Sequence, residues 1–68
     1  MTKTDLRNIL DIIDNEIEVQ KKLAEGFIML NPSYEYERNK ERDCAISGLI
    51  GARIAIIDKY KRIWKEEG

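Results

Sequence analysis

The chain has 68 residues, enough for one small domain. Hydrophobic residues make up 43% and charged residues 37%, a composition that allows a folded core beneath a well-solvated surface. The 12 basic residues nearly balance the 13 acidic ones. The resulting net charge of −1 argues against a protein that coats DNA, binds membranes through a polybasic patch or mimics DNA. There is no His, which excludes His-based acid–base catalysis and His-containing metal sites.

The cysteine content and the hydropathy pattern narrow the class further. The single cysteine, Cys44, cannot form an intramolecular disulfide or a thiolate metal cage, and it suits a reducing compartment. No signal peptide or membrane-spanning stretch is recognisable. We therefore expect a cytoplasmic, non-enzymatic binding protein that uses no cofactor and no metal and does not bind membranes.

The first predicted helix spans about residues 4–30. Thr4 is its expected N-cap, and Asp5 suits the positive end of the helix dipole. Gly26 either ends this helix or lies inside it, and we favour a helix that continues to Leu30, since Phe27 and Leu30 keep the helical spacing. The apolar residues that recur at three- and four-residue spacing are Leu6, Ile9, Leu10, Ile13, Ile17, Leu23, Ala24 and Phe27.

A turn is predicted over residues 31–33 and a second helix over about residues 33–65. Asn31 or Ser33 can cap a helix, and Pro32 is favoured in a first helical turn. The first half of the second helix is polar. Its second half, residues 44–57, is strongly apolar and is broken by Arg53.

Two long helices joined by a short turn form an antiparallel hairpin, in which the numbers of facing residues sum to about 64. A chain under about 70 residues gains only a few kcal/mol from its own core. We therefore predict an all-α protein: a single domain, residues 1–68, whose two-helix hairpin assembles into a homo-oligomeric helical bundle, minimally a four-helix dimer. The second helix also carries a row of small residues, which would let another helix approach closely: Ala45, Gly48, Ala52 and Ala55.

Acidic residues on the first helix are a candidate metal site. Asp11, Asp14 and Glu18 share one face and could hold Mg²⁺. No second acidic motif lies opposite to complete the ligand set. The favoured interpretation is a solvated face. Cys44 is interpreted as a small core residue.

Arg53 lies within the apolar stripe of the second helix, where a guanidinium needs an acid, an anion or access to water. The favoured interpretation is that the guanidinium extends to water or pairs with an acid such as Glu16 or Asp14 of a neighbouring chain. The alternative is an anion site at a subunit junction, because the guanidinium matches the geometry of phosphate.

Basic and aromatic residues gather near the turn, where they could pair with phosphates and stack on bases. Acidic residues between them would neutralise much of the positive charge. The same residues therefore also fit a charged helix end that binds no ligand. With Arg53, the candidate ligand-binding residues are Arg42, Arg38, Lys22, Tyr34 and Tyr36.

The second helix carries one recognisable pattern: Ala45, Ile46 and Ser47, followed by Leu49, Ala52 and Ile54, after a first helix that ends shortly before Pro32. This pattern resembles the helical hairpin of small phage sponge proteins of the anti-CBASS and anti-Thoeris types. The resemblance implies an oligomer with sites between subunits that sequester cyclic nucleotide signals of host defence enzymes, without turnover. It identifies no binding residue, and the candidates above come from the chemistry of this chain.

Three functional hypotheses follow. The first is a phage-type sponge that captures a host nucleotide second messenger. The second is a regulator or inhibitor that binds a host protein through an exposed helix stripe. The third is an RNA-binding four-helix dimer similar in layout to the plasmid copy-number regulator ROP. It ranks last because a net charge of −1 does not favour nucleic acid.

Overall fold

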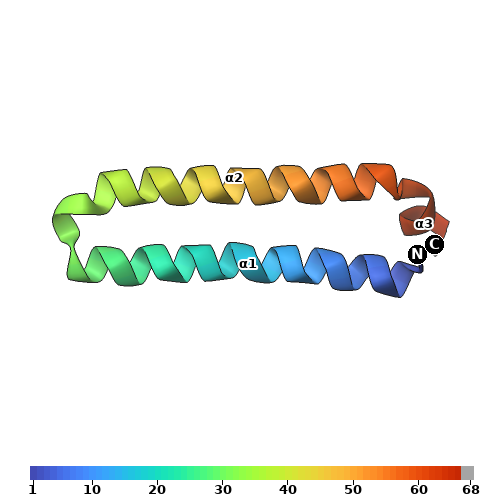
Figure 1. The fold of residues 1–68 in the computed structure, drawn as a ribbon, viewed down its shortest axis with the longest axis horizontal. Helices are drawn as coiled ribbons and strands as arrows, with labels where there is room; N and C mark the ends of the chain where they lie inside the picture. Colours follow the sequence, from blue (N-terminus) through green and yellow to red (C-terminus); the bar gives the residue numbers. More distant parts are fainter. Residues whose placement is uncertain (67–68) are drawn as a thin grey trace.

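A computed structural model describes residues 1–66, and every regular element in that part of the chain is a helix. Helix α1 (Lys3–Leu30) is followed by a 3-10 turn, η1 (Pro32–Tyr34), then by α2 (Glu35–Lys59) and the short α3 (Lys61–Glu66). Helices α1 and α2 lie side by side and run in opposite directions, and α3 turns across the open end beside the N-terminus (Figure 1). The molecule is a rod of 49 × 17 × 16 Å. The predicted all-helical class is confirmed for residues 1–66.

The N-cap of helix α1 is Thr2, two residues before the predicted Thr4, and the helix begins at Lys3. The Thr2 hydroxyl accepts from the Asp5 backbone N–H at 3.1 Å, and the Asp5 carboxylate accepts from the Thr2 N–H at 3.2 Å. These bonds form a capping box. The Thr2 backbone N–H, and secondarily its side chain, lower the pKa of Asp5. The box is therefore intact at neutral pH and is lost as the pH falls through that lowered pKa.

The C-terminal end of α1 is closed by Asn31. Its backbone N–H donates to the carbonyls of Phe27 (2.9 Å) and Ile28 (3.2 Å), and its side-chain amide donates to the Phe27 carbonyl at 3.1 Å. The helix runs through Gly26 to Leu30, as favoured from the spacing of apolar residues. The helix ends here because the backbone of Asn31 departs from helical values (φ −136°, ψ 67°), as expected of a residue that precedes a proline.

The residues predicted to form one second helix form three segments in the structure. Residues 32–34 form the 3-10 turn, and the helix breaks at Tyr60, whose φ of −110° and ψ of 25° depart from helical values. After this break α3 brings Trp64 close to α1, with the Lys3 ammonium 5.5 Å from its ring centroid. The break at Tyr60 therefore lets the end of the chain cover part of the first turn of α1.

The core of the hairpin is very small. Among the residues whose side chains are described, three are buried, Leu6, Leu10 and Ala24, and none of them belongs to α2. Cys44 is exposed, so its interpretation as a core residue is wrong: it lies on the part of α2 that does not face α1. The exposed large aliphatic residues of the two long helices are Ile12, Val19, Leu23, Met29, Leu30, Ile50 and Ile54.

The N-terminal cap can be tested by substitution. Thr2→Ala is expected to lower the free energy of unfolding by about 1 kcal/mol, since it leaves a first-turn N–H without its partner. Thr4→Ala is the matched control and should change stability little, because Thr4 lies inside the first turn. Urea unfolding at one fixed protein concentration measures both. A larger loss for Thr4→Ala would contradict the assignment.

Candidate functional site

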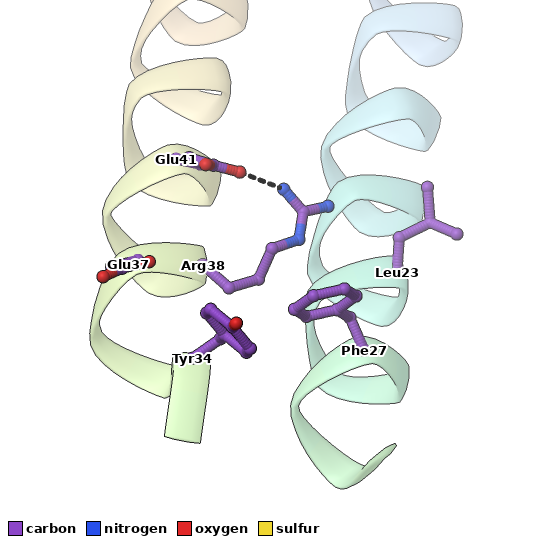
Figure 2. A pocket seen from close by; sticks show the side chains of 6 residues that line it. All are labelled: Leu23, Phe27, Tyr34, Glu37, Arg38 and Glu41. Carbon is purple, nitrogen blue, oxygen red and sulfur yellow. Dashed lines mark hydrogen bonds and ion pairs between the residues drawn. The ribbon is translucent and has the colours of Figure 1, made fainter. Parts of the chain in front are cut away.

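A groove opens where α1 and α2 meet at the turn end of the rod. Its volume is about 510 Å³. Figure 2 shows the side chains of α1 on one side and those of η1 and α2 on the other. The six lining residues are Leu23, Phe27, Tyr34, Glu37, Arg38 and Glu41.

Two aromatic rings form the apolar part of this groove. The ring centroids of Phe27 and Tyr34 are 6.3 Å apart at 60°, an edge-on contact that ties η1 to α1. Phe27 nevertheless remains 42% exposed and Tyr34 52% exposed. Each residue therefore keeps free surface on which a planar ligand can stack.

The groove holds one cation and two carboxylates. The Arg38 guanidinium lies 5.9 Å from the Phe27 ring centroid and donates through Nη1 to Glu41 at 3.2 Å. The Glu41 side chain is 70% exposed, so the Arg38–Glu41 pair contributes at most about 1 kcal/mol. An incoming anion can therefore displace Glu41 from Arg38 at small cost. Glu37, the other carboxylate, makes the groove less attractive to anions.

The structure brings together two of the six candidate ligand residues, Tyr34 and Arg38. Tyr36 lines a different depression on α2, together with Asp43 and Cys44. Arg42 donates to Asp43 at 3.0 Å, and neither Arg42 nor the exposed Lys22 lines the groove.

Phe27 and Leu23 were not among the candidates. Their helical spacing assigned them to the hairpin core, whereas the structure leaves both exposed. Their position close to the predicted turn could have indicated this exposure. Residues just before a tight turn lie at the end of the contact between the two helices.

Arg53 is bound within its own chain. Its Nε donates to Asp14 Oδ1 at 2.8 Å, with the two side chains 35% and 48% exposed. Asp14 was an expected partner, and here it belongs to the same chain, whereas the expectation placed it on a neighbouring chain. Facing residues sum to 67 here and not to about 64, because the turn extends to Tyr34 and its centre lies beyond Pro32. Arg53 is also 15 residues from Arg38, roughly 22 Å along α2, and does not belong to the groove.

The acidic face of α1 is partly engaged by cations. Asp14 accepts from Arg53, and Glu18 lies 3.5 Å from the Lys21 ammonium. Asp11, Asp14 and Glu18 do border one shallow depression on α1. Within residues 1–66, no group of three or more His, Cys, Asp or Glu side chains is arranged to hold a metal ion.

None of the described helices contains a stretch long and apolar enough to cross a bilayer. The sequence matches no protein-family model, and neither a curated protein nor a solved structure is significantly similar to it. The resemblance to phage sponge proteins therefore stays a prediction.

The pair between α1 and α2 can be tested by a double-mutant cycle. Asp14→Asn and Arg53→Gln are each expected to lower the free energy of unfolding by about 1 kcal/mol or less, because both groups are partly solvated. Their coupling should be about 0.5 kcal/mol and independent of protein concentration, as an intrachain contact requires. The exposed Glu18–Lys21 pair is the comparison and should couple more weakly. Coupling that grows with protein concentration would indicate that Arg53 pairs between chains.

Proposed function

We propose that the chain is a non-enzymatic binding protein whose hairpins self-associate into a homo-oligomeric helical bundle, with the four-helix dimer as its smallest form. The supporting observation is how little the hairpin buries: three side chains on α1 and none on α2 among those described. Each large aliphatic side chain left in water forfeits roughly 1.5–3 kcal/mol of burial energy. Ile12 is 70% exposed and Ile54 is 62% exposed, so association has much to gain.

Self-association is measurable directly. Sedimentation equilibrium at micromolar concentration is expected to give at least 16 kDa, twice the 8.0 kDa of one chain. Dilution should lower the melting temperature, since dissociation exposes apolar surface. A stable 8 kDa species with a concentration-independent melting temperature would contradict the proposal.

The ligand proposed for this oligomer is a nucleotide second messenger, captured stoichiometrically in the cytoplasm as phage-type anti-defence sponges do. The groove at the turn end supports this with two partly exposed aromatic residues and the Arg38 guanidinium. Stacking on an aromatic side chain contributes about 1–3 kcal/mol per base, and the guanidinium fork pairs with phosphate. Capture without turnover fits a groove that offers recognition groups and no Ser, Cys or His.

Binding can be tested with a panel of cyclic di- and trinucleotides and cyclic ADP-ribose isomers. A bound member at 100 times its dissociation constant should add about 2.7 kcal/mol to stability and raise the melting temperature. Arg38→Gln should weaken that ligand at least tenfold. Glu41→Gln should strengthen it severalfold, because the carboxylate that competes for Arg38 is gone.

Arg42→Gln is the matched control and should leave affinity unchanged, since Arg42 faces Asp43 outside the groove. No thermal shift across the panel would end the nucleotide proposal while leaving self-association standing.

A second candidate is a regulator that docks a host protein on its exposed apolar residues. Exposed Ile12, Val19 and Leu23 on α1 favour it. A defined heteromeric complex, formed while the nucleotide panel stays silent, would support this function. Strongly salt-dependent RNA binding would support the ROP-like alternative.

A further inference from the structure

The turn-end groove fixes which sides of α1 and α2 belong to one face of the hairpin, here called the groove face. Leu23 and Phe27 of α1 line the groove together with Glu37 and Glu41 of α2 (Figure 2). Residues spaced by three, four or seven lie on the same side of a helix. The groove face therefore continues along α1 from Leu23 to Val19 and Ile12.

The same spacing extends the face along α2. From Glu41, steps of 4, 7, 11 and 14 residues lead to Ala45, Gly48, Ala52 and Ala55, all of which are exposed. We call these four residues the trough. The ridge on α1 consists of Ile12, Val19, Leu23 and Phe27, also exposed. One face thus carries large side chains on one helix and small ones on the other.

Ridge and trough are in register. The Asp14–Arg53 ion pair joins residues of α1 and α2 whose numbers sum to 67. By that rule Ile12 is level with Ala55, Val19 with Gly48, and Leu23 with Cys44, next to Ala45. At each of these levels along the rod, a large side chain on α1 therefore lies beside a small residue on α2.

We propose that the groove face binds the groove face of a second copy, so that the ridge of each hairpin enters the trough of the other. This inference rests on the proposed self-association and specifies its geometry. A two-fold axis parallel to the helices sets α1 of one copy over α2 of the other and keeps residues at their own heights. Both turns then lie at one end. A two-fold axis across the rod, with α1 over α1, would set ridge against ridge.

The size of the face matches what a stable dimer needs. A rectangle of 49 × 17 Å covers about 830 Å², against roughly 800 Å² per partner in a standard protein interface. The trough contains no charged residue, and the nearby Arg53 is already paired with Asp14. On the ridge helix, Glu16 accepts from Gln20 at 3.1 Å and has a stem long enough to keep its carboxylate in water.

Gly48 is the central position of the trough. A Cβ built there meets no atom within 4 Å in the single hairpin, and the same holds for Gly26 and Gly51. Glycine inside a helix costs up to about 1 kcal/mol relative to alanine, and nothing in the single chain requires it. In the proposed dimer, the Val19 side chain of the partner takes the space above Gly48.

This arrangement also completes the candidate site. With both turns at one end, the two turn-end grooves face each other. Phe27, Tyr34 and Arg38 of both copies would then line a single chamber, together with Glu37 and Glu41 of both copies. Two guanidiniums related by a two-fold axis can pair with a ligand that has two phosphates if that ligand displaces Glu41 from each Arg38, and such a site is incomplete in one chain.

Leucine substitutions at neighbouring positions of α2 separate the possible interfaces. Gly48→Leu should raise the dimer dissociation constant at least tenfold in sedimentation equilibrium. Ser47→Leu, at an exposed position on the opposite face of α2, is the control and should stay within about twofold. Circular dichroism checks that each variant remains helical. Loss of dimer with Ser47→Leu but not with Gly48→Leu would overturn the proposed face while leaving self-association intact.

Disulfide trapping tests the same arrangement by forming a covalent dimer, so it does not depend on a substitution that prevents dimerisation. In a Cys44→Ser background, Val19→Cys with Gly48→Cys should give a covalent dimer on a non-reducing gel, because the two positions meet between copies. Glu18→Cys with Ser47→Cys, on the opposite face, should stay monomeric on the same gel. A covalent dimer from the second pair and none from the first would overturn the proposal. A chain that is monomeric by sedimentation would overturn self-association itself.

Discussion

A two-helix hairpin has one seam, and this constraint governs the molecule. Each helix can turn a single stripe toward the other, so any apolar residue outside that stripe stays in water. Here the seam buries Leu6, Leu10 and Ala24 and no described residue of α2. Helices in proteins are stabilised chiefly by packing of their apolar faces against other elements. The apolar middle of α2 has little such packing in the single chain. The proposed association and the proposed site both follow from this unmet burial.

A polar contact across the seam reports how the two helices are aligned. The 2.8 Å bond from Arg53 to Asp14 crosses between helices at mid-length, and Asn31 fixes where α1 ends. Although the ion pair adds little energy, it specifies which residues stand level. That register is what puts Val19 beside Gly48 and gives the groove face its alternation of large and small side chains.

The helical class and the extent of α1 could be predicted from the sequence, because an apolar repeat of three and four residues is a local signal. The cap at Thr2 was missed because Thr4 stands closer to the first apolar residue, although Thr2 and Asp5 have the spacing of a capping box. The break at Tyr60 was also missed, because contacts with the first turn of α1 are tertiary.

The candidate site was less predictable than the fold. Tyr34 and Arg38 stand four residues apart and could be grouped from spacing alone. The exposure of Phe27 depends on how far the turn extends before α2 begins. Helical periodicity shows that a residue faces a neighbour but does not show whether that neighbour covers it. Asp14 was foreseen as a partner of Arg53, but on a neighbouring chain, because a sum of about 64 for facing residues does not place Asp14 level with Arg53 in one hairpin.

The rod places the start of α1 and the short α3 together at the end opposite the turn (Figure 1). A fluorescent protein or affinity tag joined before Lys3 would therefore sit most of the 49 Å length away from Phe27 and Tyr34. In the parallel arrangement the first turns of both α1 helices and both α3 helices would lie at one end. A flexible linker could then join two copies into a single polypeptide, whose effective local concentration would hold the pair together even at nanomolar dilution.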